Sequence, residues 1–440
     1  MSSFPVAPRE PGAHPALRKA ASASFIGNFV EWFDYASYGY LATVIAIVFF
    51  PSDDPTASLL LTFGVFALSF ILRPIGAVVW GNWGDRFGRR WALSWSILLM
   101  SGSTFLIGLL PGYATIGILA PIALLVLRMI QGFSASGEYA GASIFLAEYS
   151  SAKRRGLLTS IVPASTAAGL LMGSLFATGL HTLLSEADMH AWGWRIPFLL
   201  AGPLGLVGRY IRVHLEDSPE YLAMVKGSAT NAEHHTPLRT LLRHHWRTTL
   251  IAFGVASLNA VAFYVLLSYM PTYLSAELGM GDTESFLAST ITLAVYVGFI
   301  FVMGHISDAV GRKRMLITAC VLFILCSVPL FWALGGAGFW VVVLVEVAFV
   351  AILTMNDGTL PTFLSESFPT QVRYSGFAVS FNLANALLGG TAPLVCTWLI
   401  SLTGSVMAPA WYLVAISVVA LGAMIVAPTP VEFAGGEDLE

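Results

Sequence analysis

The sequence predicts an all-α membrane protein in which twelve transmembrane helices form two six-helix bundles related by pseudo-symmetry. The first observation is composition: of 440 residues, 56% are hydrophobic and 11% are charged, and the mean hydropathy is +0.76, which is too apolar for a soluble globular protein. The second is a series of twelve apolar stretches of about 20 residues or more, the length that crosses about 30 Å of hydrocarbon. The third is a polar motif that occurs once in each half of the chain.

The expected spans follow one another along the whole chain. The first begins behind basic residues, as a signal peptide does, but it contains Glu31 and Asp34 and ends at Pro51 without a small-residue cleavage site. We therefore predict a spanning helix there. The expected ranges are 20–50, 57–83, 91–111, 115–147, 156–183, 194–213, 248–276, 284–308, 313–334, 338–364, 372–402 and 409–428.

These spans divide the chain into two bundles and three polar segments. We expect an N-terminal tail over 1–19, a bundle over 20–213, a linker over 214–247, a second bundle over 248–428 and a tail over 429–440. Of the 22 Lys and Arg residues, nineteen fall in the N-terminal tail and the even-numbered connections, whereas the odd-numbered connections hold only Arg195. The positive-inside rule therefore predicts that both termini, the linker and both tails are cytoplasmic.

Other features exclude several classes of function. The net charge of −3 gives no reason to expect nucleic acid. The three cysteines lie inside apolar segments and suggest no disulfide framework. The linker is rich in histidine but lacks the spacing of a zinc finger, so we expect no metal. Without a phosphate-binding loop or a hydrolase motif, the chain is predicted to be neither an ATPase nor another enzyme, and to need no cofactor.

The polar motif indicates an internal repeat. GNWGDRFGRR from Gly81 aligns with GHISDAVGRKR from Gly304, at a shift of 223 positions. Two parallel repeats with a substrate site between them are typical of transporters whose access alternates by rocking. Asp85 could pair with arginines or lie near the positive N-terminus of a helix in one state; the alternative is that the motif only anchors topology. The candidate gating residues are Asp85, Arg86, Arg89, Glu148, Asp308, Arg312 and Glu366.

The first expected helix places acidic groups inside the membrane. Glu31, Asp34, Tyr35 and Tyr38 recur at helical spacing and share one face. A charge at the bilayer centre costs at least about 2.5–3.5 kcal/mol, so this face must turn away from lipid. We interpret it as the wall of a transport pathway, the alternative being a buried pair that only packs.

The expected helix 115–147 has a second polar face. Gln131 and Glu138 are seven residues apart, and Arg128 lies nearby, so this helix could present a base and an acid to one cavity. Movement of Arg128 relative to Asp34 or Glu138 could then load or release a proton. Asp34, Glu31 and Glu138 are our proton-coupling candidates, and a fixed ion pair is the alternative.

The second half also has polar groups within its expected spans. Asn382 and Asn385 could line the cavity or form interhelical hydrogen bonds equally well. Arg73, Glu277 and Glu346 have no obvious partner. The candidate substrate-binding residues are Arg128, Tyr35, Tyr38, Trp32, Gln131, Tyr264, Asn382 and Asn385.

Taken together, these motifs resemble the major facilitator superfamily and, within it, the metabolite:proton symporter family, over nearly the whole chain. The stretches that carry the resemblance are GNFVEWFDY from Gly27, RPIG from Arg73, the motif from Gly81, RMIQGFSASGEYAGA from Arg128, WGWRIPF from Trp192, LEDSPEY from Leu215, SYMPTYL from Ser268 and FPTQVRYS from Phe368. Two late stretches, SFNLANALLGGTAPLVCTWLI from Ser380 and APAWYL from Ala408, look most like the proline/glycine betaine branch.

This resemblance implies a symporter in the bacterial inner membrane that brings in a zwitterionic osmolyte with a proton. We expect it to act as a monomer. A trimethylammonium or pyrrolidinium cation would suit the faces of Trp32, Tyr35, Tyr38 and Tyr264, and Arg128 could meet the carboxylate. The alternatives are a proton symporter for an organic carboxylate such as oxoglutarate or citrate, in which Arg128 and Arg73 dominate the pocket, and a membrane sensor that transports nothing.

Overall fold

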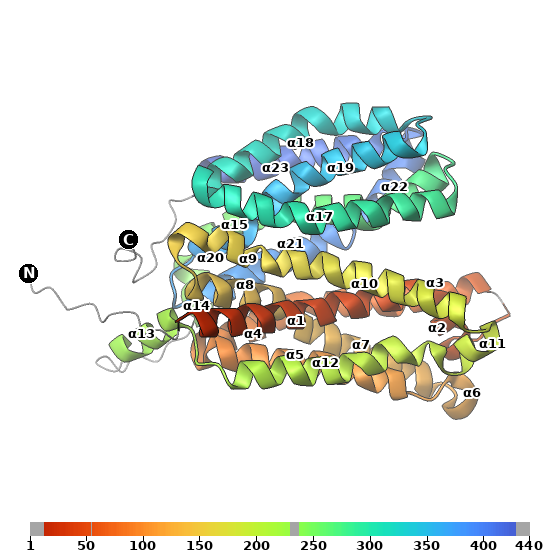
Figure 1. Ribbon diagram of the computed structural model, residues 1–440, viewed down its shortest axis with the longest axis horizontal. Helices are drawn as coiled ribbons and strands as arrows, with labels where there is room; N and C mark the ends of the chain where they lie inside the picture. The colour runs from red at the N-terminus through yellow and green to blue at the C-terminus, as the bar shows by residue number, and fades with distance from the viewer. Residues whose placement is uncertain (1–12, 54, 229–236, 428–440) are drawn as a thin grey trace, which may run out of the picture.

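The computed structural model describes residues 13–53, 55–228 and 237–427, and within these ranges the chain is helical without any strand. The long helices run roughly along one direction, and α1 begins at the same end of the molecule at which α23 ends (Figure 1). We call this the terminal end, and the opposite one the far end. Parts of three predicted polar segments, 1–12, 229–236 and 429–440, lie outside the described residues.

The first half of the chain forms helices that lie together in the lower part of Figure 1. There α1 packs on α10 and α12, α5 on α7 and α12, and α3 on α7. The elements are α1 (Ala13–Tyr40), α2 (Ala42–Phe49), α3 (Pro55–Ile71), α4 (Arg73–Phe87), α5 (Arg89–Leu109), α6 (Tyr113–Ile116), α7 (Leu119–Ala135), α8 (Glu138–Tyr149), η1 (Ala152–Arg154), α9 (Arg155–Thr159), α10 (Ile161–Leu183), α11 (Glu186–Asp188), η2 (Met189–Gly193) and α12 (Arg195–Val213).

The second half forms the upper part of the molecule, where α17 packs on α19, and α23 packs on α15 and α18 (Figure 1). Its elements are α15 (Trp246–Phe263), η3 (Tyr264–Tyr269), α16 (Met270–Thr272), η4 (Tyr273–Glu277), α17 (Asp282–Val310), α18 (Arg312–Leu334), α19 (Phe339–Asp357), α20 (Leu360–Glu366), α21 (Arg373–Ala384), η5 (Asn385–Gly389), α22 (Ala392–Thr403) and α23 (Ala408–Val426). Between the two groups, α13 (Pro219–Ser228) and α14 (Pro237–His244) lie at the terminal end (Figure 1).

The two groups of helices meet along two seams. Helix α4 packs on α21, and α9 and α10 pack on α17. Towards the terminal end, one buried cluster takes side chains from both groups, among them Trp80, Leu93, Phe363 and Tyr374. The chain therefore joins its two groups most closely at the terminal end. The exact residues at which one bundle gives way to the next stay a prediction.

Among the described residues, ten helical segments are long and apolar enough to cross a membrane, and a bent pair adds an eleventh. The expected continuous span 20–50 is wrong in detail, because the chain bends by 70° between α1 and α2. The expected span 57–83 is divided between α3, with 17 residues, and α4, with 15. Pro74 is the second residue of α4 and lacks the N–H that would continue the preceding helix. Both departures are breaks within expected spans.

Three helix breaks place charged side chains inside the membrane region. Arg73 is the first residue of α4, Glu138 follows Gly137 at the start of α8, and Asp357 is the last residue of α19 before Gly358. Interrupted helices at membrane depth are tolerated where they line a cavity or are buried in protein. These breaks therefore mark the interior of the molecule.

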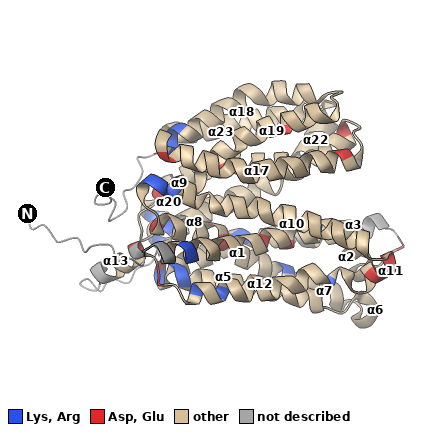
Figure 2. Cartoon of the chain, viewed as in Figure 1, with Lys and Arg blue, Asp and Glu red and all other residues tan. Residues whose placement is uncertain are grey.

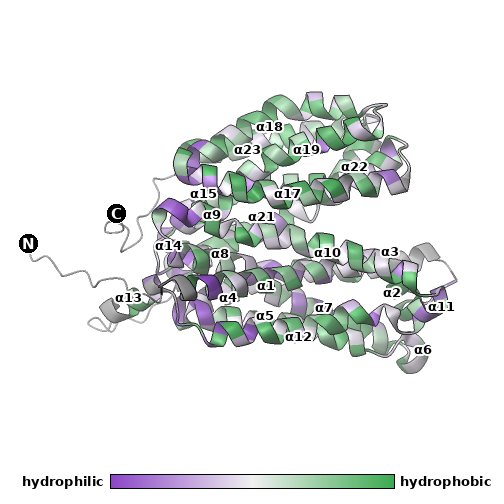
Figure 3. Cartoon of the chain, viewed as in Figure 1, coloured by the Kyte–Doolittle hydropathy of each residue, from purple (hydrophilic) through white to green (hydrophobic). Residues whose placement is uncertain are grey.

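The surface is apolar along the helices and charged at the ends. Figure 3 shows hydrophobic residues over most of the helical length and hydrophilic ones gathered at the terminal end. In Figure 2 most of the Lys and Arg residues lie at that same end. Large apolar side chains such as Trp332, Leu344, Leu394 and Trp398 are exposed on the outside, which fits contact with lipid rather than water. The chain is therefore a multi-pass membrane protein.

Candidate functional site

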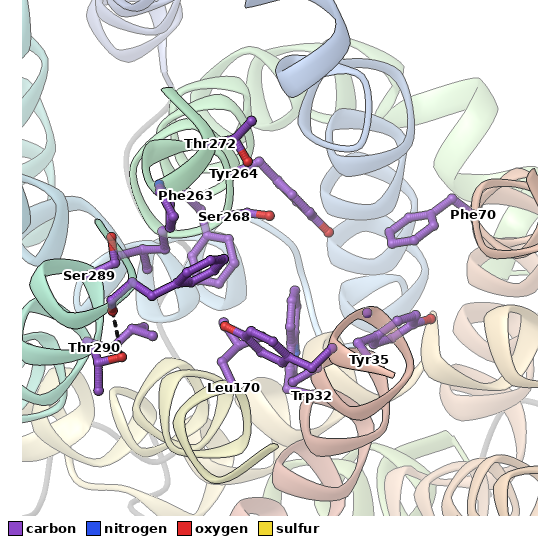
Figure 4. A pocket seen from close by; sticks show the side chains of 17 residues that line it. Trp32, Tyr35, Phe70, Leu170, Phe263, Tyr264, Ser268, Thr272, Ser289 and Thr290 are labelled. Carbon is purple, nitrogen blue, oxygen red and sulfur yellow. Dashed lines mark hydrogen bonds between the residues drawn. The ribbon is translucent and has the colours of Figure 1, made fainter. Parts of the chain in front are cut away.

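A cavity of about 440 Å³ lies between the two groups of helices. Its walls are mainly aromatic and come from α1, α3, η3 and α17, with Trp32, Tyr35, Phe70, Tyr264 and Phe286 among them (Figure 4). The lining follows α1 from Trp32 to Tyr40, towards the far end. This volume falls within the range of about 300–1,000 Å³ that is usual for small-molecule sites.

The aromatic rings of this cavity contact one another across the two groups. Trp32 of α1 lies edge-on to Phe263 of α15 at 5.3 Å between ring centroids, and Phe70 of α3 lies 6.5 Å from Tyr264. The indole N–H of Trp32 and the hydroxyl of Tyr264 are buried and have no hydrogen-bond partner in the part of the chain that the structure describes. Two donors are thus available beside the cavity. Of the predicted substrate-binding residues, Trp32, Tyr35 and Tyr264 line it.

An ion pair lies directly behind this wall. The Arg73 Nη2 is 2.7 Å from the Glu31 Oε1, and both side chains are buried. The guanidinium carbon is 5.0 Å from the ring centre of Tyr35 and 4.8 Å from that of Phe70, and both rings line the cavity. The sequence alone indicates no partner for Arg73. The signal for its role is that it directly precedes Pro74, where an apolar run is interrupted.

Asp34 makes a second buried pair, on the same helix as Glu31. Its Oδ2 is 2.7 Å from the Arg128 Nη1 and accepts a hydrogen bond from Gln131 Nε2 at 3.1 Å. The Arg128 guanidinium lies 3.8 Å from the ring centre of Tyr38, whose hydroxyl donates to the carbonyl of Thr62. The structure therefore brings together four predicted residues, Asp34, Arg128, Gln131 and Tyr38. None of the four lines the large cavity.

The spacing along 115–147 suggested that Glu138 and Arg128 could face one cavity. The structure instead directs Glu138 to another arginine. The break at Gly137 starts a new helix, and Glu138 pairs there with Arg212 of α12. Ser96 donates a further hydrogen bond to the Glu138 Oε2 at 3.1 Å. In the sequence, Arg212 lies at the end of the expected span 194–213, where an arginine indicates topology rather than a partner inside the membrane.

The two predicted asparagines lie apart from the large cavity. Asn382 donates to the carbonyl of Ser136, in the other group of helices, at 2.8 Å, and to that of Ala378 at 2.9 Å. Asn385 donates to the carbonyl of Phe381 at 3.0 Å. For Asn382 the geometry favours the alternative of an interhelical hydrogen bond.

Two buried carboxylates on α19 have no basic partner among the described residues. Asp357 accepts hydrogen bonds from Asn259 Nδ2 at 2.6 Å and from the Tyr296 hydroxyl at 2.7 Å. Glu346 accepts from Ser289 at 3.2 Å and from Thr292 at 2.7 Å. Neither was among the predicted site residues.

At the terminal end, the first copy of the polar motif joins the two groups of helices. Asp85 is 2.8 Å from Arg89 and also accepts the backbone N–H groups of Tyr374 and Ser375, in the first turn of α21, at 3.0 and 2.8 Å. Both expected positions of this carboxylate, beside an arginine and at a helix N-terminus, are thus present. Glu148 lies 2.7 Å from Arg373.

The second copy makes the same contacts with the roles of the two groups exchanged. Asp308 is 2.8 Å from Arg312 and accepts the N–H groups of Gly156 and Leu157, at the start of α9, at 2.8 and 3.0 Å. Glu366 is 2.8 Å from Arg155. Each group therefore caps a helix of the other at the terminal end.

The turn inside each copy depends on glycine. Gly88 and Gly311 have φ angles of 106° and 98°, which residues with a Cβ rarely adopt. Arg86 lies outside the network, since it is exposed and its guanidinium lies over the ring of Phe87. Asp217, in the loop after α12, accepts the backbone N–H of Arg89 at 3.1 Å. Burial raises the pKa of the Asp217 carboxyl above its usual value.

Comparison with known proteins gives a consistent match. Residues 24–393 match the family model described as Major Facilitator Superfamily. The chain is 39% identical over 92% of its length to the glycine betaine/proline/ectoine/pipecolic acid transporter OusA of Dickeya dadantii, and covers 82% of that protein. It is 37% identical over 92% of its length to the proline/betaine transporter of Escherichia coli K12, and again covers 82%. A putative proline/betaine transporter of Staphylococcus haemolyticus is 38% identical, with 95% of this chain and 88% of that protein covered.

Solved structures agree on the fold. The proton:xylose symporter XylE bound to 6-bromo-6-deoxy-D-glucose superposes with a TM-score of 0.78, covering 94% of this chain and 96% of that one at 19% identity. A partially occluded inward-open structure of the xylose transporter XylE from E. coli gives a TM-score of 0.68, at 19% identity, with 94% and 98% covered. The predicted fold class is thereby confirmed.

Proposed function

The chain belongs to the Major Facilitator Superfamily and is a transporter rather than an enzyme, and we propose that it imports a small zwitterionic osmolyte of the proline or glycine betaine kind together with protons. The observation that carries the proposal is the aromatic cavity with a buried arginine behind its wall. The names of the relatives, at 37–39% identity, agree with it.

The cavity offers complementary groups for the two ends of a zwitterion. Faces of Trp32, Tyr35 and Tyr264 suit a quaternary or secondary ammonium group, an attraction of about 0.5–2 kcal/mol for each well-placed ring. Arg73, rather than Arg128, is the cation nearest to this wall. The N–H of Trp32 and the hydroxyl of Tyr264 are further donors for a carboxylate.

Proton coupling follows from the partner that Arg73 already has. While Glu31 is ionised, it occupies the guanidinium at 2.7 Å. Protonation of Glu31 removes this charge, and Arg73 can then pair with the carboxylate of the substrate instead, so that the buried site stays neutral overall. Binding of a proton thereby favours binding of substrate. Asp34 and Glu138 remain proton-coupling candidates, each with its own arginine.

The contacts at the terminal end indicate the side of the membrane to which the cavity opens. We propose that both termini are cytoplasmic, because most Lys and Arg residues gather at that end (Figure 2), and that the membrane is the bacterial inner membrane. The structure then corresponds to an outward-facing state in which the gating contacts of Asp85, Glu148, Asp308 and Glu366 are formed. Because one chain contains both bundles and the cavity between them, we propose that it acts as a monomer.

Uptake by purified protein in proteoliposomes tests this function. We expect labelled glycine betaine and proline to accumulate under an imposed inward proton gradient, and not without it. Oxoglutarate and citrate should not accumulate. Accumulation of the carboxylates alone would replace the proposal with an organic-anion symporter. No transport of any of the four compounds would favour a membrane sensor.

A substitution in the cavity wall tests the aromatic part of the site. Tyr264→Leu should raise the KM for glycine betaine about tenfold, because it removes one cation–π contact, which is worth about 1–2 kcal/mol when desolvated. Tyr264→Phe retains the ring and should leave that KM within about twofold. Initial uptake rates across a range of substrate concentrations give both values. An equal change for the two variants would contradict the role of the ring face.

A further inference from the structure

Asp357 occupies a position that the proposed function does not yet use. It ends α19, it is 1% exposed, and it faces a cavity of about 20 Å³ whose walls come from both groups of helices. Trp32, Tyr139 and Thr166 cover this cavity from the first half, and Asn259, Tyr296 and Asn385 from the second. Asp357 therefore lies at the seam that must open when the two groups rock apart.

This small cavity adjoins the large one. Trp32 and Phe263 line both, and their rings are in edge-to-face contact at 5.3 Å. A space of about 20 Å³ exceeds the 10–15 Å³ needed for one water molecule, and its polar lining could hold one. These two rings therefore lie between the carboxylate's cavity and the proposed substrate site.

The partners of Asp357 suit both protonation states. When the carboxylate is ionised, the amide of Asn259 and the hydroxyl of Tyr296 donate to its two oxygens, at 2.6 and 2.7 Å. When it is protonated, the Tyr296 hydroxyl can turn and accept, because a tyrosine oxygen both donates and accepts. Glu31, Asp34 and Glu138 differ, since each of them forms an ion pair with an arginine.

Among the residues that the structure describes, no basic side chain forms an ion pair with Asp357, so no positive charge stabilises its ionised form. On α17 the titratable neighbour is Tyr296, on α8 it is Tyr139, and α15 contributes the neutral Asn259. Helix α18 also packs on α19, but none of its basic residues lies within ion-pair distance of Asp357; they are Arg312, Lys313 and Arg314. The ionised carboxylate would thus be balanced by neutral donors alone.

We propose that Asp357 is a second proton-binding residue whose neutral form favours closure of the terminal end. In the closed arrangement Trp32 and Tyr139 cover it, and removing an unpaired carboxylate from water is costly. When the terminal end opens, water reaches the seam and the ionised form becomes favourable. Closure and protonation are therefore coupled, and the coupling is reciprocal. This inference rests on the proposed proton-coupled alternating access.

A cysteine reporter measures closure directly. Ser375 is fully buried at the seam, where its backbone N–H donates to Asp85 at 2.8 Å. We use Ser375→Cys in a chain whose native cysteines are replaced by alanine, held in lipid nanodiscs and labelled with a maleimide. Rates are divided at each pH by those of Ala223→Cys, an exposed position on α13, which removes the effect of pH on thiol reactivity.

Between about pH 6 and pH 8, we expect the normalised labelling rate of the reporter chain to rise about tenfold, as deprotonation opens the terminal end. With Asp357→Asn, which stays neutral, the rate should remain low and change less than about twofold. Glu346→Gln is the matched control, since it neutralises the other buried carboxylate of α19, which accepts hydrogen bonds from two hydroxyl groups. The labelling rate of this control should show the same pH dependence as that of the reporter chain.

Two results would overturn the proposal: no pH dependence in the reporter chain, or the same dependence after Asp357→Asn. Retained binding of labelled glycine betaine by Asp357→Asn shows that the variant is folded, and Asp357→Glu, which restores an acid, should restore the pH dependence. The labelling needs no transport. A failure of proton-driven uptake therefore contradicts the proposed function, whereas an unchanged labelling profile contradicts only the role of Asp357.

Discussion

Arg128→Gln is expected to reduce the initial rate of glycine betaine uptake by at least about 100-fold. Arg128 is fully buried, and its Nη1 lies 2.7 Å from Asp34. Removing one partner of a buried ion pair costs about 3–5 kcal/mol, because the remaining charge keeps its desolvation penalty. Uptake into proteoliposomes under a proton gradient measures the rate, and size-exclusion chromatography measures the fraction of folded protein.

The neutral double variant, Asp34→Asn with Arg128→Gln, separates structure from coupling. It leaves no unpaired charge, so we expect folded protein and exchange of labelled for unlabelled substrate. If Asp34 takes part in coupling, accumulation driven by the proton gradient should stay absent. Full recovery of accumulation would instead make the pair structural. Arg314→Gln removes an exposed arginine at the start of α18 and should leave uptake within about twofold, as for most surface substitutions.

The first helix shows how far residue chemistry alone can lead. Acidic groups cannot face lipid, so a single stripe on one helix was enough to predict that Glu31 and Asp34 point inward, and both are buried, at 2% and 4% exposure. Their partners were harder to identify. Arg128 lies on a recognisable polar face, whereas Arg73 and Arg212 lie near the ends of apolar runs, where arginine usually reports topology.

The repeat predicted the terminal end better than the cavity. Two aligned motifs identified Asp85 and Asp308, and both cap helices in the structure. The exchange of partners between the two groups depends on helix packing in space, which the alignment of two motifs does not contain. Likewise, helical spacing placed Glu138 on the face of Arg128 only while the helix was assumed to be continuous; the break at Gly137 turns it towards Arg212.

Asp357 shows a limit of a different kind. In the sequence, it is one of several polar residues in apolar spans. Its hydrogen-bond donors Asn259 and Tyr296 lie 98 and 61 positions away along the chain. An acidic residue beside Gly358 at the end of an apolar run was the available signal. What distinguishes it from Glu31 or Asp34 is the lack of a nearby arginine, and that is a property of the packed molecule.

Glu148→Gln is expected to open the terminal end. The Glu148 side chain is fully buried and lies 2.7 Å from Arg373 and 3.4 Å from Arg89. Its neutralisation removes the acid that both buried guanidinium groups share, although Arg89 keeps its pair with Asp85. Breaking such a buried pair costs about 3–5 kcal/mol, and only the closed arrangement bears this cost. We therefore expect the labelling rate of the Ser375→Cys reporter to rise at least about tenfold, since the balance between the two states shifts by the difference in their energies.

The repeat supplies a graded comparison for this prediction. Glu366→Gln is the equivalent change in the second group, but the Glu366 side chain is 10% exposed, against 0% for that of Glu148, and its second arginine, Arg312, is 3.8 Å away. Because water screens this pair more than the first, the increase in labelling should be smaller than for Glu148→Gln. Glu216→Gln removes an exposed acid at the same end and should not change the rate. Equal labelling in all three variants would mean that these ion pairs do not hold the terminal end closed.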